Sequence, residues 1–266
     1  MNIPPIIYGT AWKADATENL VLTALKTGFR AIDTANQRKH YDETAVGNAL
    51  IKSGIARDQL FLQTKFTYVD GQDHRVPYDP HADYATQVWQ SFQSSLQHLQ
   101  TNYIDSYLLH GPSSWIGLAP ADWQVWQEME ALHEEGKVTS LGISNVNLGQ
   151  LELLYQKAVV KPTFVQNRCY AQLGWDKEVR EFCTQKGLIY QGFSLLTANT
   201  FILPKLKFLV EKYRKTPAQI IFRFAQHIGI LPLTGTTHPK HMQEDLSLSF
   251  NLDEKDITFI DHIALG

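Results

Sequence analysis

Short, continuously apolar runs alternate with longer amphipathic stretches along almost the whole chain, and this alternation restricts the folds that are open to it. Continuous apolar character is typical of parallel strands that are covered on both faces. Strand–helix units of about 30 residues indicate either an open, doubly wound sheet or a (β/α)8 barrel. The eight runs that we expect to be buried strands are 5–9, 29–33, 60–65, 104–110, 138–145, 163–167, 188–194 and 229–235.

The number of strands and the residues between them favour the barrel. Helix-start signals stand between the runs, among them Thr17, Asp42 and the pair Thr216-Pro217. No strand is followed by the G-x-G-x-x-G pattern of an open dinucleotide-binding sheet. Because no linker or low-complexity stretch divides the chain, we expect residues 1–266 to form one (β/α)8 TIM barrel.

Composition excludes several classes of protein. There are 24 lysine and arginine residues against 27 aspartate and glutamate residues, a net charge of −3, and no basic patch suited to nucleic acid. No apolar run approaches the roughly 18 residues of a membrane span, and the N-terminus does not resemble a secretory signal. Cys169 and Cys183 are too few for a disulfide framework and are expected to be core thiols. We therefore expect a soluble, cytoplasmic protein.

Polar side chains stand where the predicted strands end, which a barrel built for stability alone does not need. Taken singly, Asp33 is equally well a turn residue and His110 a core histidine. Because all barrel strands open at one mouth, we expect these residues to form one ring, which the polar loop 67–80 covers. The ring contains Asp33, Lys65, His110, Ser144, Asn145, Gln166, Asn167, Phe193, Ser194, Gly235, Thr236 and Thr237.

The chain resembles the aldo-keto reductases, and the matching motifs run in order through nearly its whole length. They are YGTAWK (8–13), GFRAIDTA (28–35), YDETAVGNAL (41–50), TKFT (64–67), SSLQHLQTNYIDSYLLHGP (94–112), GKVTSLGISN (136–145), VQNR (165–168), TPAQI (216–220) and LPLTGTTHPKHMQEDL (231–246). The resemblance implies a (β/α)8 barrel that binds an extended nicotinamide cofactor without a Rossmann domain. It also implies a reductase of small aldehydes and ketones.

The resemblance further implies a catalytic tetrad, which falls on Asp33, Tyr41, Lys65 and His110. Tyrosine is a weak acid, and a neighbouring ammonium such as that of Lys65 is expected to lower the pKa of Tyr41 by stabilising the phenolate. Asp33 is expected to keep Lys65 charged, and His110 to hold the substrate oxygen. Tyr41 then gives its proton to the carbonyl oxygen.

The resemblance also implies the residues that bind the cofactor. Ser144, Asn145 and Gln166 are expected to bind the carboxamide of the nicotinamide, and Phe193 to stack on its ring. Ser194 and Leu195 are expected at the pyrophosphate. The residues expected around the adenosine are Thr236, Thr237, His241, Glu244 and Asp245, and the remaining cofactor residues are Thr10, Ala11, Thr234 and Gly235. Members that prefer the 2′-phosphate usually place a lysine and an arginine near it, whereas His241 occupies the arginine position here. We expect NADPH to be preferred, with a weaker charge clamp and with NADH as a second cofactor.

Departures from the family pattern concern the substrate pocket. The loop that leads to Tyr41 is lengthened within NQRKH, and we expect His40 in it to be solvated. Gly111 stands where many members carry a bulky aromatic, so either Trp115 turns into the substrate pocket or the pocket is wider. Trp12 matches an aromatic that lines the substrate pocket in the family. Since the C-terminal loop of longer relatives is almost missing, we expect an open site that accepts varied aldehydes and ketones.

Two alternative functions fit the sequence less well than a reductase. A regulatory barrel that senses cofactor, as in some channel subunits, is disfavoured by the complete tetrad and by the lack of a long N-terminal appendage. A metal-dependent hydrolase is disfavoured because the ten histidines are scattered and form no H-x-H or H-E-x-x-H pair, so no metal site is expected. The protein is expected to act as a monomer on a small carbonyl compound.

Overall fold

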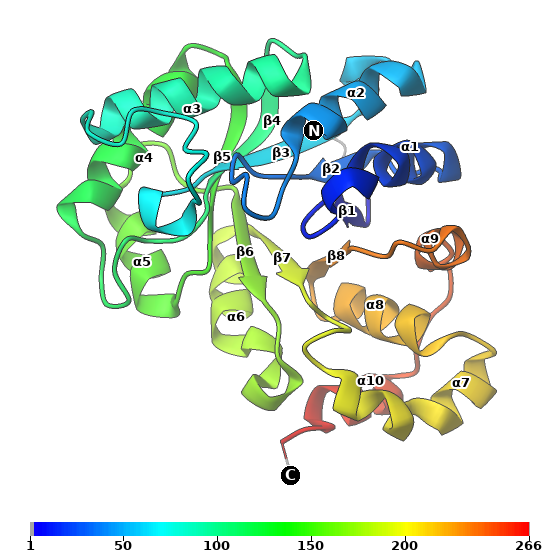
Figure 1. Cartoon of the computed structure of the whole chain (residues 1–266). Helices are drawn as coiled ribbons and strands as arrows, with labels where there is room; N and C mark the ends of the chain where they lie inside the picture. Colours follow the sequence, from blue (N-terminus) through cyan, green and yellow to red (C-terminus); the bar gives the residue numbers. More distant parts are fainter. Residues whose placement is uncertain (1–2, 266) are drawn as a thin grey trace.

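Eight parallel strands close into a barrel in the computed structural model, which describes residues 3–265 (Figure 1). The strands pair in chain order, and β1 also pairs with β8. This confirms the predicted (β/α)8 TIM barrel, with strand ends that differ from the predicted runs by at most two residues. The strands are β1 (Ile7–Gly9), β2 (Ala31–Asp33), β3 (Phe61–Phe66), β4 (Ile104–Leu109), β5 (Val138–Ser144), β6 (Phe164–Arg168), β7 (Ile189–Phe193) and β8 (Ile230–Thr234).

The helices surround the strands on the outside of the barrel (Figure 1). They are α1 (Thr17–Thr27), α2 (Glu43–Ser53), α3 (Tyr84–Leu99), α4 (Pro120–Glu134), α5 (Leu148–Lys157), α6 (Lys177–Lys186), α7 (Lys207–Tyr213), α8 (Pro217–His227), α9 (Pro239–Leu246) and α10 (Glu254–His262). Short 3-10 turns are η1 (Ala14–Ala16), η2 (Arg57–Gln59), η3 (Val69–Gly71), η4 (Ala171–Asp176) and η5 (Thr200–Leu206). Within residues 3–265 no helix has both the length and the apolar character needed to cross a membrane.

Two of the three predicted helix starts are confirmed. The Asp42 side chain accepts a hydrogen bond from the Ala45 backbone N–H at 2.9 Å and so caps α2, and Thr216 caps α8 in the same way. Thr17 is not a cap, because the turn η1 precedes it and makes it the first residue of α1. Its hydroxyl donates to the carbonyl oxygen of Ala14 at 2.7 Å instead.

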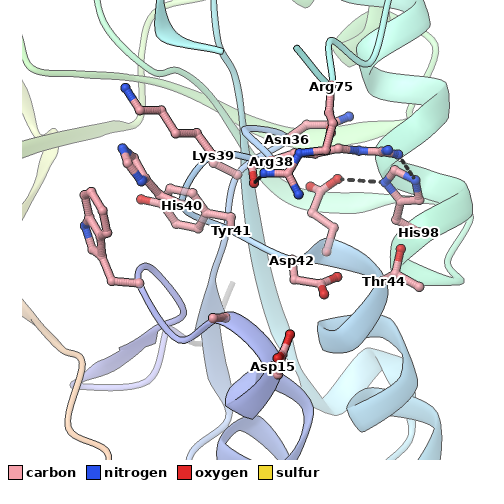
Figure 2. A pocket seen from close by; sticks show the side chains of 14 residues that line it. Asp15, Asn36, Arg38, Lys39, His40, Tyr41, Asp42, Thr44, Arg75 and His98 are labelled. Carbon is pink, nitrogen blue, oxygen red and sulfur yellow. Dashed lines mark hydrogen bonds and ion pairs between the residues drawn. The ribbon is translucent and has the colours of Figure 1, made fainter. Parts of the chain in front are cut away.

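The lengthened loop between β2 and α2 is held from outside the barrel. Arg38 donates a hydrogen bond to His98 Nε2 of α3 at 2.9 Å, and Arg75 donates to the carbonyl oxygen of Arg38 at 2.6 Å. Figure 2 shows Arg38 lying toward His98, with His40 and Tyr41 on the other side of the loop. The loop thus spans from the outer helix α3 to the mouth of the barrel.

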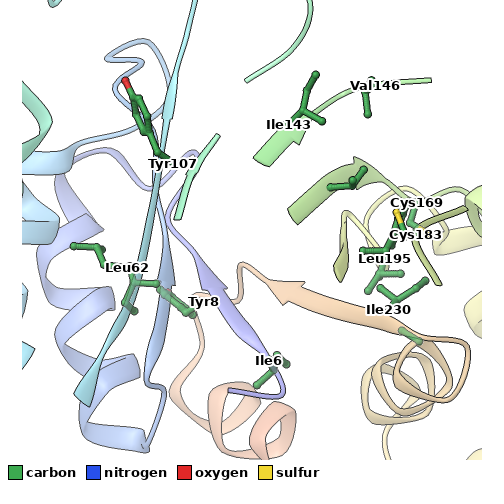
Figure 3. Close-up of a cluster of buried hydrophobic side chains, with 14 of the residues drawn as sticks. Ile6, Tyr8, Leu62, Tyr107, Ile143, Val146, Cys169, Cys183, Leu195 and Ile230 are labelled. Atoms are coloured by element: carbon green, nitrogen blue, oxygen red, sulfur yellow. The ribbon is translucent and has the colours of Figure 1, made fainter. Parts of the chain in front are cut away.

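The main apolar core lies between the strands and the helices. Figure 3 shows some of its side chains, including Tyr8 of β1, Leu62 of β3 and Tyr107 of β4, all fully buried. Cys169 and Cys183 belong to the same core, where both are free thiols as predicted. Burial of this layer supplies most of the favourable free energy of folding, because that energy grows with the apolar area removed from water.

The interior of the barrel changes character along its axis. Side chains alternate between the two faces of each strand. Residues that face the outer helices therefore alternate with residues that point into the barrel. The inward residues at the start of the strands form a small apolar cluster that includes Ala31 and Phe61, which are paired across β2 and β3. Two residues further along, the inward pair is Asp33 and Gln63. The polar site therefore rests on an apolar base inside the barrel.

Two helical glycines in opposite surroundings provide a matched test of how α2 packs on α3. A Cβ at Gly47 of α2 would lie 2.1 Å from the carbonyl oxygen of His98, whereas Gly149 of α5 is exposed and its nearest neighbour is 3.6 Å away. We expect Gly47→Ala to lower the free energy of unfolding by about 1–3 kcal/mol through overpacking. Gly149→Ala is expected to raise it by about 0.5 kcal/mol, because alanine favours a helix. Urea unfolding measures both, and a stabilising Gly47→Ala would contradict this packing.

Candidate active site

A buried ion pair joins β2 and β3 near the mouth of the barrel. Lys65 is fully buried, and its Nζ donates to both carboxylate oxygens of Asp33, at 2.7 and 2.8 Å, and to the carbonyl oxygen of Thr34 at 2.9 Å. Burial lowers the pKa of Lys65, and the negative charges of Asp33 and Glu43 oppose this change. Asp33 is thus the main influence that keeps the buried amine protonated.

Tyr41 lies beside this pair, with Lys65 Nζ 5.5 Å from the centroid of the phenol ring. The expectation that Lys65 lowers the pKa of Tyr41 is not met: burial raises this pKa, and the charge of Asp33 raises it further. Lys65 directs its hydrogen bonds to Asp33 and Thr34 rather than to the phenol, and burial and the charge of Asp33 set the direction of the pKa change. Tyr41 is therefore a neutral hydroxyl at ordinary pH.

His110 follows β4 and faces Tyr41 edge-on, with ring centroids 5.9 Å apart. Its Nδ1 lies 2.7 Å from the hydroxyl of Thr67. Burial, and then the positive charges of Lys65 and His40, lower the pKa of His110 to about 3. The imidazole is therefore neutral. If the Thr67 hydroxyl donates to Nδ1, the proton of His110 sits on Nε2, where it can be donated to a ligand.

A cavity of about 1030 Å³ opens above these side chains and brings most of the predicted site together. It is lined by loops and strand ends from β1, β2 and β4–β8 and by residues of α8 and α9. The predicted residues that line it are Ala11, Trp12, Asp33, Tyr41, His110, Ser144, Asn145, Gln166, Phe193, Ser194, Leu195, Thr234, Gly235, Thr236, Thr237, His241, Glu244 and Asp245.

Other predicted residues lie outside the cavity. Thr10 is buried, and its hydroxyl donates to the carbonyl oxygen of Asp33 at 3.0 Å. Lys65 lies behind Asp33 and does not line the cavity wall. Trp115 is 94 % exposed on the loop after β4 and makes no part of the wall. The loop 67–80, expected to cover the site, contributes no lining residue; its first residue instead supports His110.

Lys13 lines the cavity and was not among the predicted residues, although it ends the motif YGTAWK. It is 6 % exposed, its Nζ donates to the carbonyl oxygen of Gly235 at 2.8 Å, and no carboxylate within residues 3–265 pairs with it. Burial lowers the pKa of Lys13 to about 8. A buried cation without a carboxylate is suited to an anionic ligand.

In this described part of the chain, no group of His, Cys, Asp and Glu side chains is arranged to hold a metal ion.

His40 was predicted to be solvated, whereas in the structure it is only half-exposed. The lengthened loop returns toward β1, so the His40 ring packs against Trp12 with centroids 3.5 Å apart and ring planes tilted by 31°, and both line the cavity. The backbone N–H of Trp12 also donates to the carbonyl oxygen of His40 at 2.8 Å. Trp12 remains 74 % exposed, so the pair forms an aromatic wall at the open end of the cavity.

Three lining residues adopt left-handed backbone conformations although none is glycine. The φ angles are 62° at Trp12, 53° at Asn145 and 57° at Ser194. Such conformations cost on the order of 1–3 kcal/mol each and collect at binding sites, where the surrounding structure holds them. Their position around one cavity indicates that the backbone there is shaped for a ligand rather than for stability.

Comparisons with known proteins agree with this geometry. The family model described as "Aldo/keto reductase family" matches residues 5–265. The chain is 30 % identical to a glyoxal reductase of Bacillus subtilis over 249 residues, covering 93 % of this chain and 83 % of the relative. It is 32 % identical to an NAD/NADP-dependent indole-3-acetaldehyde reductase of Schizosaccharomyces pombe, covering 89 % and 80 %. The crystal structure of an aldo/keto reductase from Brucella melitensis superposes with a TM-score of 0.83 at 30 % identity, covering 98 % and 95 %.

The low pKa of His110 predicts how stability depends on pH. Between pH 6.5 and 3 the unfolded chain protonates this histidine and the folded chain does not, so stability falls as pH falls through this range. From pH 7 to pH 5 the loss from this residue is about 2 kcal/mol. We expect His110→Phe to remove that part of the pH dependence of the free energy of unfolding, while the control His81→Asn, at an exposed histidine, keeps it. Equal slopes for wild type and His110→Phe would contradict the assignment.

Proposed function

The chain belongs to the aldo/keto reductase family and is therefore an oxidoreductase, and on that premise we propose that it reduces aldehydes and ketones to alcohols with NADPH. The observation that carries the proposal is that Tyr41, His110 and the Asp33–Lys65 pair meet at one end of a single large cavity. The matched relatives include a glyoxal reductase and an indole-3-acetaldehyde reductase, both named for carbonyl compounds. Their names support the reaction class and leave the substrate of this chain to experiment.

Tyr41 is proposed as the general acid. A raised pKa keeps its hydroxyl protonated at ordinary pH, and a proton need only leave as negative charge develops on the carbonyl oxygen. Lys65 then stabilises the phenolate that forms, because its ammonium is held 5.5 Å from the ring. The charge of Asp33 keeps Lys65 protonated for this role. The Lys65 ammonium therefore stabilises negative charge on Tyr41 only in the transition state, and the pKa of Tyr41 stays raised before the reaction begins.

His110 is proposed to position the substrate. As a neutral imidazole it can donate from Nε2 to the carbonyl oxygen without adding charge. Tyr41 and His110 face each other edge-on, so a carbonyl oxygen between them receives hydrogen bonds from both. Two donors aimed at one oxygen orient the carbonyl carbon and stabilise the negative charge that develops on the oxygen.

The residues around the cavity fit a nicotinamide cofactor, which supplies a hydride to the carbonyl carbon when bound. Lys13, a buried cation without a carboxylate, suits the pyrophosphate, and Phe193 offers an aromatic face for the ring. Gln166 donates through Nε2 to Asp33 at 3.1 Å and to Gln191 at 2.9 Å. Only its Oε1 is left for a carboxamide, so Gln166 would accept a hydrogen bond there.

The far end of the cavity suits a weak preference for NADPH. Among its lining residues, Glu244 and Asp245 carry carboxyl groups, and His241 is a basic side chain on the same helix α9. Burial raises the pKa of Asp245 to about 6, so this carboxyl is still mostly ionised at pH 7 and loses its negative charge only below about pH 6. Lys240 on α9 is exposed and 3.8 Å from Glu244, so it can also turn toward a 2′-phosphate. One of the matched relatives is named for both NAD and NADP.

We also propose that the site is open to varied small carbonyl compounds and that residues 1–266 act as one catalytic domain, as a cytoplasmic monomer. Trp12 and His40 wall the open end of the cavity, and Trp115 does not narrow it. An exposed aromatic wall provides apolar contact without a closed shape, so it discriminates weakly between substrates.

Carbonyl reduction is tested first by the loss of NADPH absorbance with a panel of aldehydes and ketones. We expect turnover of several of them, and we expect Tyr41→Phe to lower kcat by about 1,000-fold because the acid is lost. The control Tyr84→Phe, at a tyrosine of α3 outside the cavity, should keep wild-type activity. A preference for one compound by several orders of magnitude would contradict the open site. Cofactor binding without turnover of any compound would instead support a cofactor-sensing barrel.

Cofactor preference is tested by the dissociation constants of NADPH and NADH. We expect NADPH to bind more tightly, by about tenfold, because the charge clamp is weak. Lys13→Met should weaken both cofactors to the same degree, since both carry the pyrophosphate. His241→Ala should weaken NADPH alone. Equal dissociation constants for the two cofactors in the wild type would end the claim of a preference.

A further inference from the structure

A layer of polar side chains lies inside the barrel just below the ion pair. Gln63 of β3, Ser106 of β4 and Gln191 of β7 are fully buried, and Gln166 of β6 is 4 % exposed. Strand register sets this layer, because Gln63 pairs with both Asp33 and Ser106, and Gln166 pairs with Gln191. Barrel interiors are usually filled with bulky apolar residues, so three buried amides at one level need an explanation.

The amide of Gln63 has every hydrogen-bonding position filled. Its Nε2 donates to Asp33 Oδ1 at 2.7 Å and to Gln191 Oε1 at 2.8 Å. Its Oε1 accepts from Ser106 Oγ at 2.8 Å and from Gln191 Nε2 at 3.0 Å. A buried amide that uses both donors and both lone pairs is held in one orientation.

The charge of Asp33 determines which way each amide points. An ionised carboxylate accepts hydrogen bonds and donates none, so the atom that Gln63 turns toward it must be nitrogen. The same holds for Gln166, whose Nε2 lies 3.1 Å from Asp33 Oδ1. Gln191 must then present its oxygen to both of these nitrogens. The three amides therefore form one network that is complete only when Asp33 is ionised.

We propose that Gln63 is a positioning residue for the reduction, which holds Asp33 ionised and aimed at Lys65, and which through Gln191 turns Gln166 so that its oxygen faces the cofactor. This inference rests on the proposed function for its effect on turnover. Of the three side chains that donate to Asp33 Oδ1, Gln63 alone is neither charged nor part of the cavity wall. Its hydrogen bond therefore stays the same whatever the cavity holds.

The consequence for Lys65 follows from the groups that face it. Asp33 from β2 and Glu43 from α2 hold its charge, while Tyr41 and His110 beside it are neutral. A hydrogen bond to a charged group is about twice as strong as one between neutral groups. Without the Gln63 donor, the Asp33 carboxylate takes a proton from Lys65 more readily, so the pair shifts toward a neutral amine beside a neutral carboxyl group.

The test uses Gln63→Met, which keeps the volume and removes every hydrogen bond of the amide. In 13C-lysine-labelled protein without cofactor at pH 7, with the Lys65 signal assigned by its loss in Lys65→Met, we expect the Lys65 Cε signal to move from the ammonium position toward that of a neutral amine. The kcat for carbonyl reduction should fall at least tenfold, because fewer molecules hold the ammonium that stabilises the phenolate. The control Ser106→Ala removes one hydrogen bond to the Gln63 oxygen and leaves its N–H groups in place, so its Lys65 signal should match that of wild type.

A second variant keeps the proposal testable if Gln63→Met does not fold. Gln63→Glu retains the shape but donates to Asp33 only when the new carboxyl is protonated. We expect its kcat relative to wild type to be highest at low pH and to fall as that carboxyl ionises, and we expect Lys65 to titrate higher, because a second negative charge faces it.

Two outcomes would overturn the proposal. One is a Lys65 signal in Gln63→Met that is unchanged from wild type, and the other is the same change of signal in Ser106→Ala, which would mark a general loss of packing. If the wild type reduces no carbonyl compound, the proposed function fails, but the Lys65 signal still decides the role of Gln63.

Discussion

The contact between the Lys65 ammonium and the Asp33 carboxylate, inside a closed parallel barrel, is the constraint on which the rest of the site depends. Removing two charges from water costs several kcal/mol per ion, and their attraction offsets this only if further hydrogen bonds complete both groups. The structure provides them from two strands and one backbone carbonyl. Lys65 donates to the carbonyl oxygen of Thr34, and Asp33 accepts from Gln63 of β3 and Gln166 of β6. A pair so completed stays charged in a fully buried place. Tyr41 and His110 are then set beside a fixed dipole rather than beside a mobile ion.

The strand pattern allows such a pair without weakening the fold. Neighbouring residues of β3 point to opposite faces. Leu62 therefore joins the outer apolar core (Figure 3), while Gln63 points inward to Asp33. The outer face carries the apolar burial that stabilises the protein, and the inner face at the mouth is free to be polar. Phe61 and Phe164, edge-on at 5.5 Å, close the barrel below the polar layer. The outer face of the strands thus stabilises the fold, and the inner face near the mouth carries the polar residues of the site.

The sequence predicted the fold and most of the cavity wall, because both follow from periodicity and from the order of the strands. Residues at strand ends, such as Asp33 and Gln166, meet at one mouth in any barrel. Sequence reasoning failed where the outcome depends on contacts between distant segments. The pKa of Tyr41 rises because folding buries the phenol beside the charge of Asp33, and His40 is only half-exposed because the loop returns to Trp12. Neither contact has a signature in the local sequence.

The loop that carries Tyr41 is braced from outside the barrel, since Arg38 is bonded to His98 of α3 and Arg75 to the backbone of Arg38. His98 accepts from Arg38 through Nε2, so in its neutral form its proton lies on Nδ1, 3.5 Å from Glu43, the first residue of α2. The position of Tyr41 therefore depends on hydrogen bonds that its loop makes outside the barrel, through Arg38 and Arg75. Substitutions at these outer positions would change where the phenol lies in the cavity while every residue of the cavity wall stays the same.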